Sequence, residues 1–184
     1  MLRRLITTAA LVGVTALTAC GPDNPKPPPF TPSVAPSSSA TPVADPEAAG
    51  SAAVAAYRRY LEVLDKMTSS GGVDTRDLPA VAADVELAVS QNQAETYRGR
   101  KIKSVGSLKV VWAKPSAIGK PVGGHIVTAS VEACIDASGV DAIDSTGKSV
   151  RKPGTPARWI DTRQLKLFGE QWKVVKGKNE AAKC

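Results

Sequence analysis

Residues 142–149, AIDSTGKS, contain the glycine, lysine and serine that phosphate-binding loops use. In such a loop, backbone amides and the first turn of a following helix surround the phosphate, and a strand of a parallel sheet precedes it. Here the chain continues into residues 150–156, VRKPGTP, where a helix starts poorly. We therefore interpret residues 142–149 as a turn and not as a nucleotide site.

Three aspartates in the same region have side chains that could ligate calcium. Asp136, Asp141 and Asp144 lack the spacing of a calcium-binding loop and its terminal Glu. Aspartate next to serine and glycine commonly forms turns, so turn formation is the better interpretation. We assign no metal ligand and no cofactor from the sequence.

Cys20 ends a segment that is typical of protein export. A basic start precedes an apolar run over residues 5–17, which is too short to remain as a transmembrane helix. The last four residues, LTAC, resemble the lipobox of bacterial lipoproteins. That resemblance implies a diacylglycerol on the Cys20 sulfur and loss of residues 1–19 as a signal peptide. The alternative is an ordinary secretory signal with an incidental cysteine.

Residues 20–44 follow as a lipidated cysteine and a spacer. Eight of the 14 prolines fall within residues 22–44, between Ser, Thr and Ala. Such a composition buries no apolar face and favours extended conformations, so we expect a disordered linker. The remainder, residues 45–184, has the size of one domain.

Two cysteines remain once Cys20 is set aside as a lipid attachment site. In an oxidising compartment, an even remainder favours a disulfide between Cys134 and Cys184. Closing a loop of ~50 residues stabilises a fold by about 4 kcal/mol in the chain-entropy model. A metal site or a nucleophilic thiol is the alternative, but His125 is the only histidine and no Cys-x-x-Cys spacing occurs.

The chain is basic: 24 Lys and Arg against 17 Asp and Glu give a net charge of +7. The net charge becomes +5 when Arg3 and Arg4 are lost with the expected signal peptide. Export excludes nucleic acid as a partner. It leaves anionic headgroups, an anionic wall polymer or an envelope protein, besides the membrane that the lipid itself would enter. A basic surface that only aids solubility is equally compatible.

Helical signals come first in the domain. Asp45-Pro46-Glu47 is a helix start, and Val54, Tyr57, Leu61 and Leu64 recur on one face as far as the glycines at 71–72. A second helix is predicted from near Asp77 to before Gly99. Its apolar stripe comprises Leu78, Val81, Val85 and Ala88.

From Val105 the apolar period changes to two, which indicates strands. The alternating positions are Leu108, Val110 and Trp112, followed by Val127, Ala129, Val131, Ala133 and Ile135. A short segment over 140–143 leads into a turn at 144–147, and strands at 159–168 and 172–175 meet across Gly169-Glu170. Helices followed by an antiparallel meander predict an α+β fold.

This order over about residues 46–184 resembles the nuclear-transport-factor-2-like, or cystatin-like, cone fold, in which helices pack into a curved antiparallel sheet. The segments ASVEACIDASGVDAIDSTGKSV and QWKVVKGKNEAAKC are similar to small lipoproteins of high-GC Gram-positive bacteria and their phages. The matching positions are Cys134, Asp136, Trp172, Val174 and Cys184. Most such relatives have no assigned activity, so this resemblance implies a fold more than a function.

Enzymes with the cone fold place a catalytic Asp, His or Tyr inside the cavity. The candidates for this cavity are Tyr57, Tyr60, Asp84, Trp112 and Asp161. Spacing fixes no pair among them, so we assign no catalytic residue, and core packing is the alternative for the tyrosines.

A basic contact patch is a further candidate, because residues 97–131 contain no acid. Its residues are Arg98, Arg100, Lys101 and Lys103. A solvated strand face, on which lysines discourage edge pairing, is the alternative.

We expect a lipid-anchored, non-enzymatic binding domain on the extracytoplasmic face of a bacterial membrane. If a phage encodes the chain, interference with a superinfecting phage is a further alternative. A cavity filled by Tyr57, Leu61, Val85 and Trp112 would favour a binding module. A large apolar pocket with paired polar groups would favour a small-molecule carrier or an enzyme.

Overall fold

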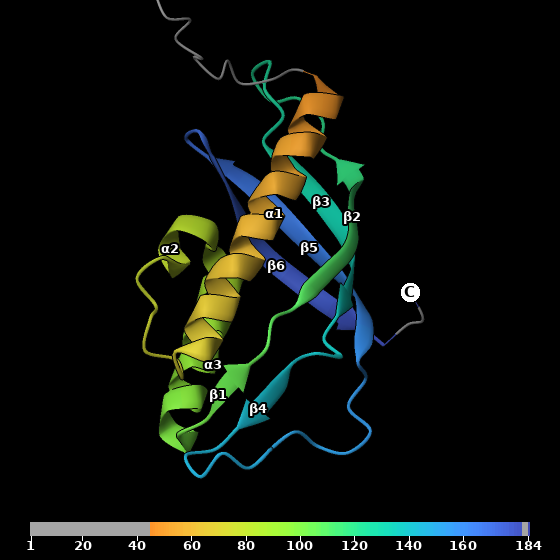
Figure 1. Cartoon of the computed structure of the whole chain (residues 1–184). Helices are drawn as coiled ribbons and strands as arrows, with labels where there is room; N and C mark the ends of the chain where they lie inside the picture. Colours follow the sequence, from red (N-terminus) through yellow and green to blue (C-terminus); the bar gives the residue numbers. More distant parts are fainter. Residues whose placement is uncertain (1–44, 182–183) are drawn as a thin grey trace, which may run out of the picture. The chain divides into compact units, whose positions relative to one another are not determined.

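A computed structural model describes residues 45–181 and Cys184. The predicted signal peptide, Cys20 and the predicted linker lie outside these residues. Within them the chain forms three helices and then six strands (Figure 1). The helices are α1 (Pro46–Ser69), α2 (Leu78–Val81) and α3 (Asp84–Arg100). The strands are β1 (Lys103–Val105), β2 (Lys109–Ile118), β3 (Thr128–Asp136), β4 (Asp141–Ile143), β5 (Arg158–Phe168) and β6 (Gln171–Glu180). No helix in this part of the chain is both long and apolar enough to cross a membrane.

Helix α1 begins where its capping residues predict. The Asp45 carboxylate accepts a hydrogen bond from the Glu47 backbone N–H at 2.9 Å, and Pro46 occupies the first turn. The face with Ala53, Tyr57 and Leu61 is buried against the sheet. Burial of this face, more than helix propensity, holds α1 in place.

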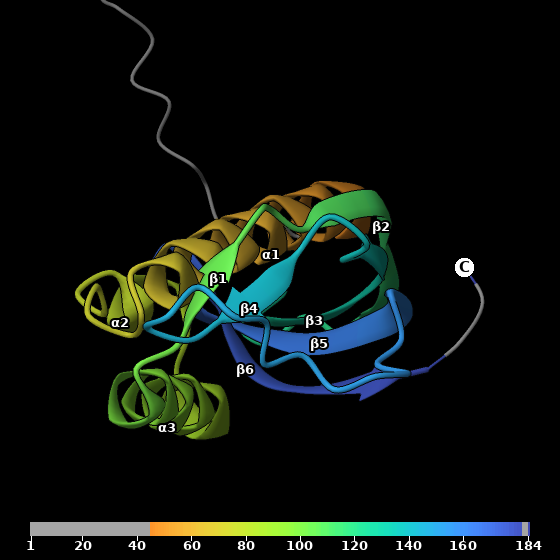
Figure 2. The same cartoon turned by 60° about the horizontal axis from the view of Figure 1, so that its bottom comes forward.

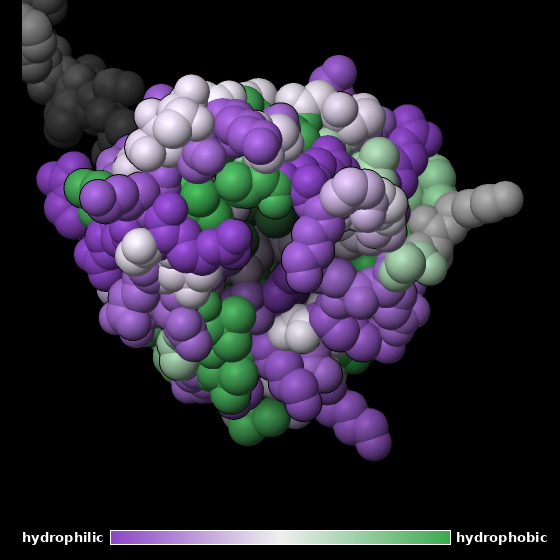
Figure 3. Space-filling model, turned by 90° about the horizontal axis from the view of Figure 1, so that it is seen from below, coloured by the Kyte–Doolittle hydropathy of each residue, from purple (hydrophilic) through white to green (hydrophobic). Residues whose placement is uncertain are grey.

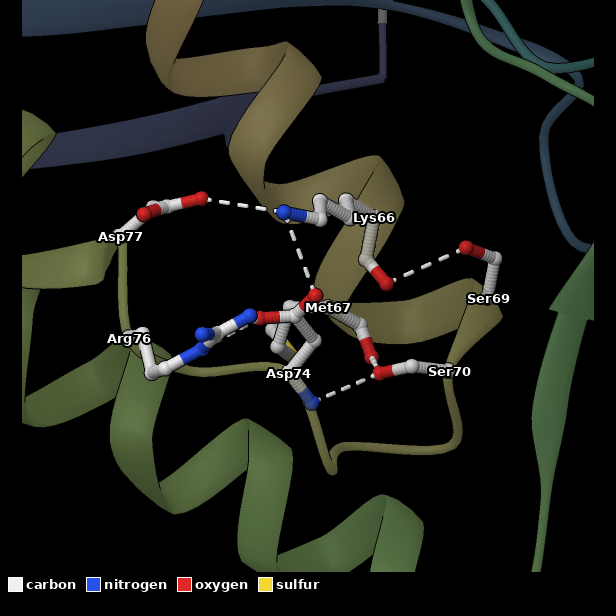
Figure 4. A network of polar contacts seen from close by, with 7 residues as sticks. All are labelled: Lys66, Met67, Ser69, Ser70, Asp74, Arg76 and Asp77. Atoms are coloured by element: carbon white, nitrogen blue, oxygen red, sulfur yellow. Dashed lines mark hydrogen bonds and ion pairs between the residues drawn. The ribbon is translucent and has the colours of Figure 1, made fainter.

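The end of α1 is a glycine cap. The Gly72 N–H donates to the Met67 carbonyl at 2.8 Å, the Gly71 N–H donates to the Thr68 carbonyl at 3.1 Å, and both glycines have positive φ. Polar contacts then fix the following loop (Figure 4): Lys66 Nζ lies 3.2 Å from Asp74 Oδ2 and 3.1 Å from Asp77 Oδ2. This cap and loop direct the chain back toward the sheet.

The prediction of a single second helix is wrong, because this part of the chain forms two helices, α2 and α3. Ala82 and Ala83 are extended, Ala82 bridges Val174 in parallel, and the Ala83 N–H donates to the Val174 carbonyl at 2.9 Å. The break ties the helices to β6 and changes which face of α3 is buried. Glu86, Ser90 and Ala94 are buried, whereas Val85 is 60% exposed.

The main sheet has the strand order β2-β3-β5-β6, and every pairing is antiparallel. It curves around α1, and α3 lies beside β6 (Figures 1 and 2). The predicted alternation in β3 is confirmed: Ala129, Val131, Ala133 and Ile135 are buried together in the core with α1. The expected fold class, helices packed on a curved antiparallel sheet, is therefore confirmed.

Strand β2 departs from the predicted alternation at a β-bulge. Val110 pairs with Ile135, but Trp112 pairs with Cys134, so Val111 is an extra residue. Cross-strand partners share a face of the sheet, and Cys134 points away from the α1 side. Trp112 is consequently on the outer face, where Lys114 Nζ lies 5.0 Å from its ring centroid.

A small second sheet joins β1 to β4 at the edge of the domain, and Ser104 pairs with Ala142. The turn after β4 forms at Asp144, whose Oδ1 accepts hydrogen bonds from the Thr146 and Lys148 backbone N–H groups at 2.8 and 3.1 Å. Within residues 142–149, strand β4 ends at Ile143 and the chain turns at residues 144–147, where the sequence predicts a turn. Within the described chain, no three His, Cys, Asp or Glu side chains gather as a metal site would need.

Cys134 and Cys184 are joined by a disulfide, with their Cα atoms 5.9 Å apart. Cys134 lies on β3, whereas Cys184 follows β6, and β5 lies between these two strands. The bond therefore connects the end of the chain to the outer face of the sheet across β5.

Candidate functional site

A cavity of about 420 Å³ opens between α1, α3 and the concave face of the sheet. Figure 3 shows a hollow on the side of the domain where β1 and β4 lie. Its apolar wall includes Leu61, Leu64, Leu108, Ile135, Val140 and Trp159. Volumes of this size hold small organic ligands.

Ionic side chains lie on one side of this cavity, centred on Arg163 of β5. Arg163 Nε donates to Asp161 Oδ1 at 2.7 Å, and its Nη1 donates to Glu86 Oε1 at 2.9 Å. Its Nη2 donates to Asn179 Oδ1 of β6 at 2.9 Å. Asp161 and Arg163 share a face because they are two residues apart on one strand. Two carboxylates thus share one guanidinium, so this group of three side chains contains one more acid than base.

Tyrosines of α1 complete the ionic network. The Tyr57 hydroxyl donates to Asp161 Oδ2 at 2.7 Å, and the Tyr60 hydroxyl donates to Glu86 Oε1 at 2.5 Å. Burial and the neighbouring carboxylates raise the pKa of both hydroxyls far above the ordinary tyrosine value. Both tyrosines are therefore neutral hydrogen-bond donors at any physiological pH.

The charge of Arg163 is retained despite its burial. Burial lowers the pKa of its guanidinium, but Tyr60, Asp161 and Glu86 raise it by more, so the net shift is upward. Burial raises the pKa of Asp161, and the positive charge and hydrogen bonds of Arg163 and Tyr57 oppose this shift. Each group is hydrogen-bonded, which is what makes ionic burial tolerable.

Two further carboxylates line the cavity without a cation beside them. Among the described residues, Asp65 of α1 has no hydrogen bond or ion pair through its carboxylate, and burial raises its pKa. Asp141 of β4 accepts hydrogen bonds from uncharged donors, the Ala142 N–H and the Ser149 hydroxyl. The remaining cation, Arg151, donates to backbone carbonyl oxygens, among them that of Val140 at 2.8 Å.

Three of the five candidate cavity residues belong to this site. Tyr60 and Asp161 line the cavity, and Tyr57 lies behind Asp161. For Asp84 and Trp112 the predicted position in the cavity is wrong. Asp84 is exposed and pairs with Lys166 at 3.2 Å, because the break before α3 displaces it, and the bulge in β2 turns Trp112 outward.

Sequence reasoning missed several residues of the site, among them Asp65, Glu86, Trp159, Arg163 and Asn179. Trp159, Asp161 and Arg163 alternate along β5, so the period-two rule applied from Asp161 could have placed the other two on the same face. Nothing local marks Glu86, which reaches Arg163 only because the helix break rotates α3.

The predicted basic patch is exposed around the end of α3. Arg98 and Arg100 occupy the last turn, Lys101 caps the helix with a left-handed φ of 52°, and Lys103 begins β1. Arg98, Lys101 and Lys103 border one shallow depression of about 590 Å³, which Asp144 also borders, whereas Arg100 does not line it.

No protein-family model and no curated protein sequence matches the chain. Among solved structures, the intermembrane-space region of the chloroplast protein ARC6 is similar, with a TM-score of 0.52 and 14% identity over 75% of this chain and 98% of that one. This likeness concerns the fold alone.

Two further structures have lower TM-scores. Aln2 from a Streptomyces species has a TM-score of 0.41 and 12% identity, over 74% of this chain and 91% of that one. An NTF2-like protein from Cytophaga hutchinsonii has a TM-score of 0.39 and 17% identity, over 68% of this chain and 95% of that one.

Proposed function

We propose that the domain binds a small organic molecule in the cavity between α1, α3 and the sheet. The observation that carries this proposal is the cavity itself, which combines an apolar wall with hydrogen-bonded polar groups such as Tyr60 and Asp161. Of the expectations drawn from the sequence, this arrangement favours the small-molecule carrier. Val85 and Trp112, two of the four residues expected to fill the cavity, lie elsewhere.

The proposed role is that of a carrier or receptor and not of an enzyme. Asp161 accepts hydrogen bonds on both oxygens, from Arg163 and Tyr57, so both oxygens are already engaged by donors of the protein itself. The raised pKa values of Tyr57 and Tyr60 make these hydroxyls poor bases or nucleophiles. Binding without a chemical step is the simpler use of such a site.

The proposed location is the extracytoplasmic face of a bacterial membrane, to which a lipid on Cys20 holds the chain. Its support is the sequence alone: the basic start, the short apolar run and LTAC. Cys20→Ala should move the exported protein from the membrane fraction to the soluble fraction. Persistent membrane association of this variant would contradict the anchor.

The cavity proposal is tested by native mass spectrometry on the full chain, exported by a bacterial host and released in mild detergent. The protein is incubated with a library of size-matched neutral, anionic and cationic organic molecules. We expect at least one class to add a dissociable mass. The Ala142→Trp variant, with an indole placed in the cavity wall, should lose this mass.

The matched control is Ala55→Trp, at an exposed position of α1, which should bind as the unsubstituted protein does. If no library member binds, or if Ala142→Trp binds as well as Ala55→Trp, the cavity is not the binding site and the proposal is wrong.

A second candidate function is contact with an anionic wall polymer or an envelope protein. Arg98, Lys101 and Lys103 border one depression, and this grouping favours it. Lys101→Glu with Lys103→Glu should abolish co-sedimentation with purified anionic wall polymer at low salt, because exposed charges act within about 10 Å. Unchanged co-sedimentation would rule out the patch.

A further inference from the structure

The charges around the cavity do not balance. Four carboxyl groups line it, those of Asp65, Glu86, Asp141 and Asp161, against two guanidinium groups, those of Arg151 and Arg163. No lysine lines it among the residues that the structure describes. The chain as a whole carries +7, so the sign inside the cavity is opposite to that of the protein.

Neither arginine is available to an anionic ligand. Arg163 is only 13% exposed, and each of its three nitrogens already donates to a side-chain oxygen. Arg151 is held by the backbone carbonyl oxygens of Ala137 and Val140 at 3.2 and 2.8 Å, and by that of Pro156 at 3.2 Å. An anion would meet an excess of negative charge.

A cation, in contrast, would meet a carboxylate without a partner. The Asp65 side chain is half-buried on the cavity wall with no ion pair among the described residues, and Asp141 receives only uncharged donors. The rings of Tyr97 and Trp159 also line the cavity, and no cation of the described chain lies over either ring. Aromatic faces beside a carboxylate are a setting that recognises organic cations.

We propose that the ligand of this cavity is a small organic cation, an amine or a quaternary ammonium group attached to an apolar or aromatic body. Its charged group lies near Asp65, and its apolar body packs against Leu64, Leu108 and Trp159. This inference rests on the proposed function, since it names the chemical class that the cavity selects.

The test compares three probes of similar size by isothermal titration calorimetry on the full chain: 2-phenylethylamine, 2-phenylethanol and 3-phenylpropanoate. The amine should bind most tightly and the carboxylate most weakly. Asp65→Asn should weaken amine binding by about tenfold and leave alcohol binding unchanged, because only the amine loses a charge-assisted hydrogen bond.

The matched control is Glu62→Gln, which removes an acid from an exposed position of the same helix and should leave amine affinity unchanged. Asp141→Asn, which alters the second carboxylate without a cationic partner, is a further test variant and should weaken amine binding less than Asp65→Asn does. Equal affinity for amine and alcohol, or tightest binding of the carboxylate, overturns the inference while leaving cavity binding intact. Failure of all three probes at millimolar concentration also overturns it, and the library experiment then decides the proposed function separately.

Discussion

Arg163 is the residue on which the polar groups of the cavity depend. Its side chain is 13% exposed, and its two carboxylate partners are more deeply buried, with Asp161 at 2% and Glu86 at 5%. Each charge is tolerated only because the others are present. The ring of Tyr60, 5.7 Å from the guanidinium carbon, adds a further attraction.

Arg163→Met should therefore lower the free energy of unfolding by about 3 to 5 kcal/mol, since it leaves two buried carboxylates without a countercharge. Chemical denaturation at pH 7 measures the loss. Lys166→Met is the matched control on the same strand: its partner Asp84 is about half exposed, so this loss should stay below about 1 kcal/mol. Similar losses in the two variants would contradict the dependence on burial.

The carboxylates Asp65 and Asp136 should affect acid stability in opposite directions. Burial raises the pKa of Asp65 in the folded protein, so its charged form costs stability above that folded-state pKa. This cost disappears as the pH falls toward the pKa that Asp65 has in the unfolded chain. Asp65→Asn should thus raise the melting temperature at pH 7 and lose this advantage near pH 4.

Asp136 has a lowered pKa, because Ser138 donates hydrogen bonds to it and Arg158 forms an ion pair with it. Its stabilising effect is present above the unfolded pKa and is lost as pH falls toward the folded pKa. Asp136→Asn should therefore lower the melting temperature between about pH 5 and 7, and the difference should shrink below about pH 4. A pH series of thermal melts on both variants checks these signs, and shifts in the same direction at pH 7 would be inconsistent with the two environments.

Among the elements, the cap of α1 determines where α3 lies. Gly72 has a φ of 81°, and a Cβ added there would lie 2.1 Å from the Ala94 carbonyl oxygen of α3. The close approach of the two segments is thus possible only without a side chain.

Gly72→Ala should destabilise the domain by about 2 kcal/mol or more, from backbone strain and the clash with α3. Gly99→Ala is the control, since a Cβ there meets no atom within 4 Å and alanine favours a helix interior. Urea denaturation should therefore give a lower midpoint for Gly72→Ala and an equal or higher one for Gly99→Ala. Equal midpoints would show that the loop between α1 and α2 relaxes freely around the added side chain.

The helices and strands also show which structural features a sequence pattern can predict and which it cannot. The alternation in β3, the turn at Gly169-Glu170 and the start of α1 follow from local rules, and the structure has all three. The break at Ala82 and Ala83 and the bulge at Val111 depend on hydrogen bonds to distant strands. Each changes the side of its helix or strand on which the following side chains lie. The sequence pattern therefore misplaced Asp84 and Trp112, but it did not misplace Tyr57, Tyr60 and Asp161.

At the scale of the whole molecule, the disulfide joins the last residue to the middle of the main sheet. The sequence separation of 50 residues encloses β4, β5, β6 and their loops. Most of the cavity wall that the sheet provides lies on strands within this covalent loop or at its edge.

Cys184→Ser should lower the free energy of unfolding by about 2 to 4 kcal/mol, chiefly because the unfolded chain gains the freedom that the loop removes. Thermal melts of the exported protein measure this effect. The control is the unsubstituted protein under reducing conditions, which should melt at the temperature of the variant. An unchanged melting temperature for Cys184→Ser would indicate that the bond contributes nothing to the fold.

The position of Trp159 makes the cavity wall optically distinct. The chain contains three tryptophans, and within residues 45–181 only Trp159 lines the cavity, while Trp112 and Trp172 lie elsewhere on the sheet. The indole emission of Trp159 should shift when a ligand displaces water from its ring, against a nearly constant background from the other two. The protein therefore carries an intrinsic fluorescent reporter of cavity occupancy, and Trp159→Phe provides its blank.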